Sequence, residues 1–304
     1  MERVVGLILH HGRPAALRRC VASLAASLDP PDRILVVDNG SGDAAAALQG
    51  IRLWAGTLRV VESGRNLGFA GGVNLGLAAV RDEPWRFALL LNDDAMVRED
   101  CLSRLLDAAR RDPRAGMLGA EIRCSRDPGR VESAGIACSR ISGRVRSLGA
   151  GRRANGAPGA PVEREALSGC ALLVRREALA RAGGPDPSYF LYFEDLEWCA
   201  RVARAGFRLV YVPGALAFHE GGRLGGADRV YYSTRNQVRL VRGLHPLPGW
   251  LDPLRTLAVA AYNLAAIPRT ARRQPLAGLA AWGSGLRHGL AGRCGPRREE
   301  AGLG

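Results

Sequence analysis

The sequence predicts an α/β fold, in which a doubly wound, mostly parallel sheet is followed by a C-terminal helical extension. Short apolar runs alternate with helical segments in the first part of the 304-residue chain, and this alternation is typical of βαβ units. Several apolar runs end abruptly in acidic or amide side chains, as at residues 89–94. The pattern then becomes helical and amphipathic. We therefore place one domain at residues 1–230 and a helical region at 231–304.

The individual elements follow from local patterns in chain order. Apolar runs predict strands at residues 4–9, 33–37, 58–62, 85–91, 166–174 and 207–212. Leu17, Val21 and Leu24 recur on one helical face, so residues 14–28 are predicted as a helix that the prolines at 30 and 31 end. Further helices are expected after residue 74, from residue 176 and beyond residue 231. Residues 141–161 are rich in Arg, Gly, Ala and Pro without a period, which predicts a long mobile loop.

Composition limits the classes of partner and compartment. The net charge is +14 and the chain has no lysine, so its basic side chains are all arginine and favour anionic partners such as nucleotide diphosphates or acidic lipid surfaces. Nucleic acid is not an expected partner, because the arginines are scattered and aromatic residues make up only 6%. Seven cysteines without a CxxC pair argue against a zinc ribbon or a disulfide framework and fit the cytoplasm. Residues 4–9 are too short for a signal peptide, and residues 257–267 too short for a membrane span.

The clearest candidate site is the Asn92-Asp93-Asp94 sequence that ends the fourth predicted strand. In open α/β sheets, ligands bind just outside the carboxyl ends of the strands, and paired acids there suit a divalent cation that carries phosphate oxygens. The alternative is that these acids only open a turn and cap the next helix. Similar polar clusters follow other predicted strands, and their recurrence favours a ligand site. They are Asp38-Asn39, Asn66 with its neighbouring glycines, and Glu194-Asp195 with His219.

Six short segments resemble the family 2 glycosyltransferases of the GT-A fold, in particular their bacterial rhamnosyltransferase-like branch. They are VVDNGS (36–41), NLGFAGGVN (66–74), LLNDD (90–94), SGC (168–170), YFEDLE (192–197) and FHEGG (218–222). The resemblance covers about residues 4–240. It implies a GT-A sheet and an inverting transfer of a sugar from a nucleotide-diphosphate sugar, with dTDP-rhamnose as the first choice, to a hydroxyl acceptor. A lipid-linked cell-envelope glycan is the first choice of acceptor, and a small secondary metabolite is the second.

The resemblance also implies roles for single residues. Asp195 would be the catalytic base, with Glu194 orienting it or facing the acceptor. Asp94 and His219 would hold Mg²⁺ or Mn²⁺. The nucleotide sugar would be bound by His10, Asp38, Asn39, Arg65, Asn66, Gly72, Asn74, Asn92, Asp93 and Gly169. In the glycine loop, Gly68, Gly71 and Gly72 would let the backbone approach phosphate and adopt positive φ.

Several interpretations stay open at this point. His10 either contacts the base through its backbone or is a surface residue. Arg235 and Asn236 either clamp the diphosphate or lie on the surface of a helix. Two competing functions are a nucleotidyltransferase, although the basic glycine loop expected after the first strand is missing, and an inactive polysaccharide-assembly protein. The helical region either lies on an anionic membrane at the inner face of the cell or packs against the sheet or in a homodimer.

Overall fold

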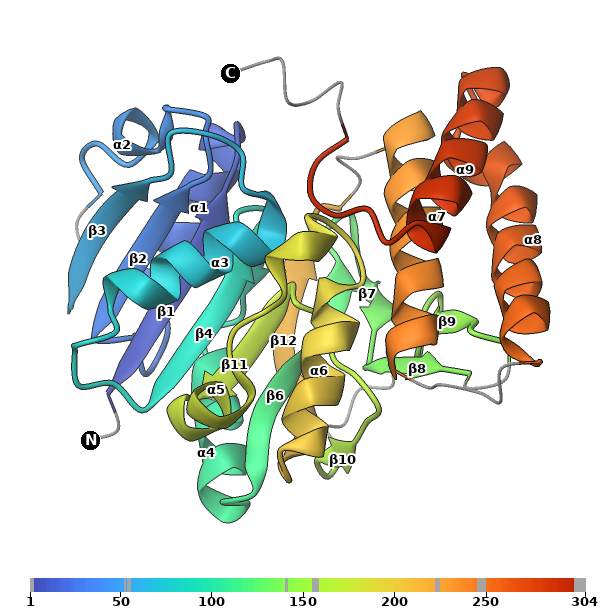
Figure 1. Cartoon of the computed structure of the whole chain (residues 1–304). Coiled ribbons are helices and arrows are strands. Elements are labelled where there is room, and N and C mark those ends of the chain that lie inside the picture. The colour runs from blue at the N-terminus through green and yellow to red at the C-terminus, as the bar shows by residue number, and fades with distance from the viewer. Residues whose placement is uncertain are drawn as a thin grey trace.

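The computed structural model in Figure 1 describes residues 3–51, 53, 56–139, 142–154, 159–221, 225–244 and 250–297. Parts of three predicted segments therefore lie outside the described residues. They are residue 222 of the last motif, residues 141 and 155–158 of the predicted loop, and residues 245–249 and 298–304 of the helical region.

A ten-stranded mixed sheet runs through the molecule, and eight of its strands follow the order β10-β12-β6-β11-β4-β1-β2-β3. Of the other two, β5 pairs with β12 and β7 pairs with β6. The strands of the whole fold are β1 (Val4–His10), β2 (Arg33–Asp38), β3 (Thr57–Glu62), β4 (Phe87–Asn92), β5 (Ala95–Val97), β6 (Ala115–Cys124), β7 (Asp127–Ser133), β8 (Ile136–Cys138), β9 (Val145–Ser147), β10 (Val162–Glu163), β11 (Ala171–Arg175) and β12 (Arg208–His219). Strands β3, β2, β1 and β4 are parallel to one another, as are β6 and β12, whereas β11 runs antiparallel between β4 and β6. The predicted mostly parallel sheet is confirmed.

Helices cover both faces of this sheet (Figure 1), as the predicted doubly wound fold requires. The helices are α1 (Pro14–Ala25), α2 (Ala44–Ala47), α3 (Gly68–Ala79), α4 (Cys101–Arg111), α5 (Arg176–Ala182), the 3-10 turn η1 (Pro187–Tyr189), α6 (Glu194–Arg204), α7 (Gly226–Leu244), α8 (Asp252–Thr270) and α9 (Pro275–Leu290). Alternate residues of β4 enter different cores, because successive side chains of a strand point to opposite faces. Leu89 and Leu91 pack with α1 and α4, whereas Ala88 and Leu90 pack with α3 and α6.

Three parts of the chain differ from the expectation. Strand β6 (Ala115–Cys124) lies in the middle of the sheet but was not among the predicted strands. The glycine segment does not precede a helix but forms it, since α3 already begins at Gly68. The predicted loop at residues 141–161 contains β9, which pairs with β8 in a small separate sheet. Strands of two or three residues are too short to show a period in the sequence, so this small sheet could not be predicted from it.

The C-terminal helices α7, α8 and α9 form a separate layer beside the sheet (Figure 1). Helix α7 begins at Gly226 and continues without a break through the domain boundary predicted at residue 230. Among the described residues, no helix combines the length and the apolar character that a membrane span needs.

Candidate active site

The predicted site residues gather at one edge of the sheet, where β1, β2, β4 and β12 end. Strand β11 begins at this edge because it runs antiparallel to β4: Ala171 pairs with Leu91, and the amide of Asn92 donates to the carbonyl of Cys170 (3.1 Å). This topology brings Gly169, which precedes β11, next to the Asn92-Asp93-Asp94 sequence. Residues separated by more than 70 positions in the chain thus share one edge.

Asp38, at the end of β2, organises the loop that follows it. Its carboxylate accepts hydrogen bonds from the amide (2.7 Å) and the hydroxyl (2.7 Å) of Ser41, and from the amides of Gly42 (3.0 Å) and Ala44 (3.0 Å). Burial raises the pKa of Asp38, but these four hydrogen bonds outweigh it and lower the pKa to about 2. The carboxylate is therefore ionised and largely occupied by its own loop. Its contact with a nucleotide base stays a prediction.

His10, at the end of β1, is fully buried between two carboxylates. Its Nδ1 lies 2.8 Å from Oδ2 of Asp93, and its Nε2 lies 2.7 Å from Oδ1 of Asp43. Burial lowers the pKa of His10, whereas hydrogen bonds to Asp93 and Asp43 raise it, and the net result is a raised pKa. The backbone carbonyl of His10 accepts a hydrogen bond from the backbone amide of Asn39 (2.7 Å). His10 is thus not a surface residue, and its side chain ties β1 to the two neighbouring loops. A contact between its backbone and a nucleotide base stays a prediction.

Asn39 and Asn66 shape the entrance to α3. The side chain of Asn39 accepts from the amide of Leu67 (2.9 Å) and donates to the carbonyl of Gly68 (3.1 Å) and to Oδ1 of Asn66 (3.2 Å). The side chain of Asn39 is buried, whereas Asn66 and its neighbour Arg65 are exposed at the rim of the site. Asn39 therefore supports a loop that presents Asn66 and Arg65 to solvent, where a ligand can reach them.

Asp94 and His219 lie together, as the resemblance implied, and form the first candidate cation site. Oδ1 of Asp94 faces Nε2 of His219 at 3.4 Å, while Oδ2 of Asp94 pairs with Arg13 (2.5 Å). The other ring nitrogen of His219, Nδ1, lies 3.0 Å from Oε2 of Glu132. Burial lowers the pKa of His219, but the two carboxylates raise it more, to about 9. A carboxylate and an imidazole whose second nitrogen is held by another carboxylate form a donor set that suits a divalent cation.

A second candidate cation site is formed by His10, Asp38 and Asp43, whose ligand atoms lie within 4.8 Å of one another. Both nitrogens of His10 are already hydrogen-bonded, and the carboxylate of Asp38 accepts four hydrogen bonds. A cation here would have to displace several of these bonds, whereas a cation between Asp94 and His219 would displace one contact, that of Oδ1 of Asp94 with Nε2 of His219. The donor chemistry therefore favours the Asp94–His219 site.

Glu194 and Asp195 begin α6 and carry perturbed carboxyl groups. Asp195 accepts from the amides of Gly169 (3.2 Å) and Leu196 (2.9 Å), which join α6 to the start of β11. Burial raises the pKa of Asp195 despite these bonds. Burial and the neighbouring Asp195 raise the pKa of Glu194 well above its usual range. Glu194 is buried, and its Oε2 has no hydrogen-bond partner among the described residues. An acceptor hydroxyl would satisfy such an oxygen.

The loop that leads into α6 adopts an unusual backbone. Phe190, Tyr192 and Phe193 have φ angles of 65°, 67° and 72°, a region that side chains other than glycine rarely adopt and that costs about 1–3 kcal/mol each. The buried side chain of Asn236, on α7, donates to the carbonyls of Tyr189 (2.9 Å), Leu191 (2.7 Å) and Tyr192 (2.9 Å). The strained loop is therefore held in place by a helix that follows it by about 40 residues in the chain.

Arg235 has a related structural role. It is fully buried and donates to the carbonyls of Tyr189 (2.7 Å) and Gly295 (2.5 Å). Both earlier interpretations of Arg235 and Asn236 are wrong: they neither clamp a diphosphate nor lie on a helix surface, because their polar atoms are used inside the protein.

Gly72 and Asn74 were predicted to bind the nucleotide sugar, but in the structure both contact other parts of the protein. Gly71 and Gly72 do not have positive φ, unlike Gly68, and a Cβ at Gly72 would collide with the side chain of Leu9. Gly72 is therefore small because α3 packs closely on β1. Asn74 lies further along α3, and its amide donates to the carbonyl of Pro185 (2.8 Å). Nothing in this geometry supports a contact between Asn74 and a nucleotide sugar.

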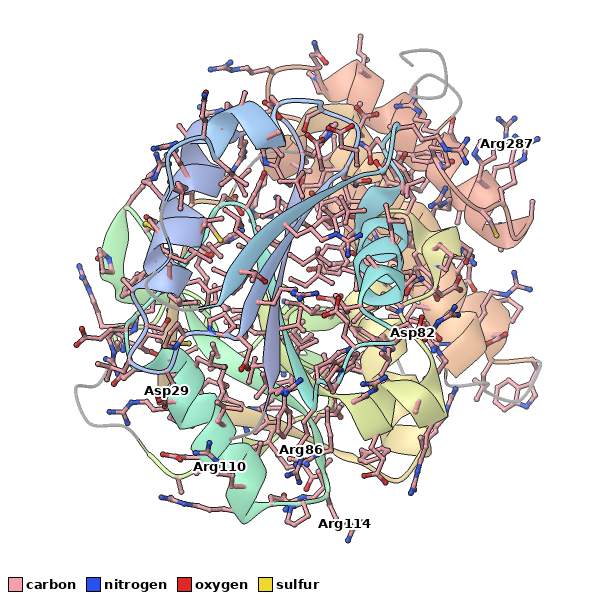
Figure 2. The ribbon with its side chains drawn as sticks, turned by 90° about the vertical axis from the view of Figure 1, so that its left-hand side faces the viewer. Asp29, Asp82, Arg86, Arg110, Arg114 and Arg287 are labelled. Carbon is pink, nitrogen blue, oxygen red and sulfur yellow. The ribbon has the colours of Figure 1, made fainter. Side chains whose placement is uncertain are left out.

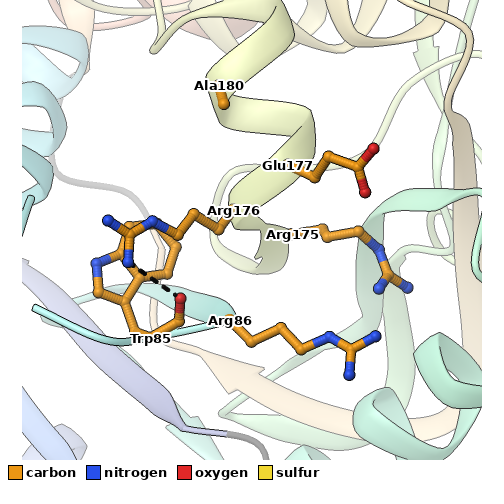
Figure 3. Close-up of a pocket in the computed structure, with 6 residues that line it drawn as sticks. All are labelled: Trp85, Arg86, Arg175, Arg176, Glu177 and Ala180. Atoms are coloured by element: carbon orange, nitrogen blue, oxygen red, sulfur yellow. Dashed lines mark hydrogen bonds between the residues drawn. The ribbon is translucent and has the colours of Figure 1, made fainter.

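Two cavities lie at the opposite end of β4 from Asp93 and Asp94. The first, about 430 Å³, is lined by Trp85, Arg86, Arg175, Arg176, Glu177 and Ala180 (Figure 3). The second, about 390 Å³, shares Trp85 and Arg176 and also contains Asn74. Two arginines at this end are used for structure: Arg176 donates to the carbonyls of Glu83 (2.6 Å) and Trp85 (3.3 Å), and Arg175 donates to the carbonyl of Ala115 (2.9 Å). We do not assign the reaction to these cavities.

Sequence reasoning missed several residues of the site. Arg13, Asp43 and Glu132 each contact a predicted site residue. Asn236 was singled out, but its contact with the loop before α6 was not expected. A cluster of strand-end acids signals Asp93 and Asp94, but Glu132 lies on β7, whose sequence has no such pattern. Arg13 lies three residues after the end of β1 and could have been found as the arginine nearest to that strand end.

Comparison with known protein sequences identifies a matching family and related rhamnosyltransferases. The family model described as "Glycosyl transferase family 2" matches residues 7–181. A protein of Mycobacterium tuberculosis named N-acetylglucosaminyl-diphospho-decaprenol L-rhamnosyltransferase is 36% identical over 231 residues, which cover 70% of this chain and 74% of that protein. Rhamnosyltransferase WbbL of Escherichia coli is 44% identical, but over 52 residues that make up 17% of this chain and 20% of WbbL.

Solved structures share the fold. GalNAc-T7, solved with UDP, GalNAc and Mn²⁺, superimposes with a TM-score of 0.61 at 16% identity, over 89% of this chain and 58% of that chain. The mannosyltransferase PcManGT of Pyrobaculum calidifontis, solved with GDP-Man and Mn²⁺, gives a TM-score of 0.56 at 20% identity, over 93% of this chain and 80% of that one. The architecture expected from the sequence is thereby confirmed as that of GT-A glycosyltransferases.

Proposed function

Because this chain belongs to glycosyl transferase family 2, we propose that it transfers rhamnose from a nucleotide-diphosphate sugar to a lipid-linked acceptor. The Mycobacterium tuberculosis relative, named as an L-rhamnosyltransferase that acts on a diphospho-decaprenol, supports both the sugar and the acceptor class. We keep dTDP-rhamnose as the first choice of donor. The family match decides against the nucleotidyltransferase alternative, and the chain is a glycosyltransferase.

The observation that carries the proposed chemistry is the carboxyl pair at the start of α6. Asp195 is held by the amide of Gly169 at the sheet edge that also carries Asp94. Its raised pKa gives it the proton affinity that a general base needs. In the proposed reaction, Asp195 removes the proton from the acceptor hydroxyl, whose oxygen attacks the anomeric carbon as the bond to the diphosphate breaks. A single displacement of this kind inverts the anomeric configuration.

Asp94 and His219 are the proposed ligands of Mg²⁺ or Mn²⁺, with Glu132 orienting the imidazole. When bound, the cation would offset the negative charge that develops on the leaving diphosphate. Arg65 and Asn66, exposed at the rim, are the proposed contacts to the donor, and Asn39 holds their loop. The roles of Asn92 and Gly169 toward the donor stay predictions, as do those of Asp38 and Asp93.

The test is a transfer assay with dTDP-rhamnose, UDP-sugars and GDP-mannose as donors and a polyprenyl-diphosphate sugar as acceptor. We expect transfer from dTDP-rhamnose, with the opposite anomeric configuration in the product. Transfer from another donor but not from dTDP-rhamnose would show that the proposed donor is wrong. A product with retained anomeric configuration would contradict a single displacement. Transfer to a small metabolite in preference to the lipid-linked sugar would show that the proposed acceptor class is wrong.

The proposed cation site makes a separate prediction. A chelator should abolish transfer, Mg²⁺ or Mn²⁺ should restore it, and full activity in excess chelator would contradict the proposal. Binding of Mn²⁺ measured by electron paramagnetic resonance distinguishes the two candidate sites without an activity assay. We expect Asp94→Asn to weaken Mn²⁺ binding and Asp43→Asn to leave it unchanged. The reverse result would place the cation beside His10.

A further inference from the structure

The outer side of α8 and α9 is a nearly uninterrupted apolar surface. Every exposed side chain of α8 from Pro253 to Pro268 is apolar or aromatic, and so is every exposed side chain of α9 from Pro275 to Ala280. The large exposed apolar residues of this surface, which we call the α8–α9 face, are Leu254, Leu257, Tyr262, Leu264, Leu276 and Leu279. In the rest of the part of the chain that the structure describes, the large exposed apolar residues are Leu28 and Val162, far from these helices in the sequence, and Trp250 and Leu290 at their ends.

Helix α9 fully buries only small residues and leaves leucines exposed, whereas a surface helix usually buries its large apolar residues. Its buried positions include Gly278, Ala281, Gly285 and Gly289. A Cβ at Gly285 would lie 2.7 Å from the carbonyl oxygen of Tyr231, which shows how closely α9 approaches α7. The small residues, together with the partly buried Trp282 and Leu286, form the protein contact. Leu276, which is 81% exposed, and Leu279 stay on the outside. Packing within the chain does not use these leucines.

Charge indicates what covers this surface. Residues 253–298 contain eight arginines and no acidic residue. Arg269, Arg272 and Arg273 are exposed where α8 meets α9, and among the described residues no ion pair involves them. Arg287 projects outward from α9 (Figure 2). The apolar surface is therefore bordered by positive charge that has no counterpart within it.

We infer that the α8–α9 face docks on the surface of an anionic lipid bilayer. Apolar side chains would enter the boundary between headgroups and acyl chains, and the arginines would meet lipid phosphates. A symmetric dimer through this face would bring the same arginines of two copies together, and this repulsion disfavours a second copy. The inference rests on the proposed function in one respect, because a lipid-linked acceptor lies in such a bilayer. Helix α7, on which both helices pack, also holds the loop before α6.

The test is flotation of the full chain with two kinds of vesicle, phosphatidylcholine alone and phosphatidylcholine with phosphatidylglycerol in equal parts. We expect binding to the second kind. The double variant Leu257→Glu/Leu276→Glu should weaken it at least about tenfold, because each leucine loses its transfer into an apolar phase. Replacing Arg269, Arg272 and Arg273 by Gln should weaken binding on the order of 100-fold, at about fivefold per charge.

Leu28→Glu is the matched control, since Leu28 and Leu257 are equally exposed (65%). It should bind vesicles like the wild type. The inference is overturned if the wild-type chain stays unbound or if Leu28→Glu loses as much binding as the double variant. It is also overturned if the wild type forms a dimer that the double variant dissociates while vesicles bind neither. Transfer to a short-chain, water-soluble acceptor should be unchanged in the double variant, so a failure of docking is distinguishable from a failure of the proposed reaction.

Discussion

At the scale of single residues, burial and hydrogen bonding drive two carboxyl groups of the site in opposite directions. Asp38 accepts four hydrogen bonds and has a lowered pKa. Asp195 accepts two from neighbouring amides, which do not offset its burial, and has a raised pKa. The same side-chain chemistry therefore provides a permanently charged loop anchor in one case and a proton acceptor in the other. Each assignment makes a separate prediction.

Asp195→Asn should lower kcat by about 10²–10⁴-fold, the usual contribution of a positioned general base. Donor binding should change little, because the amide keeps the shape of the side chain and the proposed donor contacts lie elsewhere. In the wild type, the rate should fall as the pH drops through the raised pKa of Asp195, since the base must be deprotonated. Steady-state kinetics and donor titration check both points.

Glu197→Gln is the control on the same helix. Glu197 pairs with Arg201 (2.6 Å), so this variant should keep a rate near that of the wild type. An Asp195→Asn variant with wild-type kcat would transfer the role of base to Glu194. Loss of donor binding in that variant would instead place Asp195 among the ligands of the donor.

Asp38→Asn should lower the free energy of unfolding at neutral pH by about 2 kcal/mol, the value of a pKa lowered from 3.8 to about 2. The stabilisation by Asp38 is complete above its unfolded-state pKa and is lost as the pH falls through about 2. The difference between variant and wild type should therefore shrink to about half by about pH 3. Urea unfolding at several pH values measures it. Asp107→Asn, an exposed acid on α4, should show no such pH dependence.

At the scale of elements, α7 acts on the chemistry through the loop at residues 189–193. Asn236 donates to three carbonyls of this loop, which then enters α6 at Glu194. Asn236 is thus a positioning residue, because its own side chain is enclosed by the protein. The three positive φ angles of the loop are stabilised by contacts that form only when α7 packs against it.

Asn236→Ala should lower kcat and leave the KM for the donor nearly unchanged, because the loop carries the base and not the proposed donor contacts. Asn236→Asp should be as damaging, since a carboxylate of the same shape cannot donate to carbonyl oxygens. The acid limb of the pH–rate profile should move, because Asp195 changes its surroundings. Kinetics over a pH series on folded protein give all three readouts.

Asn263→Ala provides the comparison. Asn263 is also a buried amide, but it donates to Gln237 (2.8 Å) and to the carbonyl of Val259 (3.0 Å), away from the loop. This variant should lose stability without a change in kcat or pH profile. Equal kinetic effects of Asn263→Ala and Asn236→Ala would show that Asn236 contributes only to stability and does not position the catalytic loop.

At the scale of the whole molecule, the C-terminal helices complete the catalytic region. Phe190 stacks on Tyr232 of α7 with ring centroids 5.4 Å apart, and Val238 and Val241 of α7 pack against Val259 of α8. A chain that ends after residue 244 would expose this apolar side of α7, where burial of each large side chain contributes about 1.5–3 kcal/mol.

We therefore expect the truncated chain to melt at a lower temperature and to lose transfer activity. Thermal unfolding by circular dichroism and binding of a hydrophobic dye check the first point, and the transfer assay checks the second. A truncated chain that melts and reacts like the full chain would show that residues 245–304 are not needed for the catalytic fold.

The sequence alone was enough to predict most of the main strands and helices, the doubly wound sheet and the sheet edge at which most candidate site residues lie, although it missed the central strand β6. These properties depend on local patterns: a buried strand is a run of apolar residues, and its end is marked by residues such as Asp38 and Asp94. The glycine segment was partly misread, because Gly72 meets Leu9 rather than a ligand. A glycine in a sequence can mark a place where another group comes too close for a side chain, but the sequence does not show whether that group belongs to a ligand or to the protein.

The tertiary structure alone decided which side chains meet. Arg13 pairs with Asp94, and Asn236 reaches the loop before α6, over 81 and about 45 positions of sequence. On α9 both sides are apolar in sequence, and leucines such as Leu276 and Leu286 occur on both, so the pattern cannot tell which side faces α7. Close packing of the backbones selects the small residues and leaves leucines such as Leu276 outside. Local patterns determine elements and their ends, whereas contacts between distant elements depend on shape and on the loss of water at each interface.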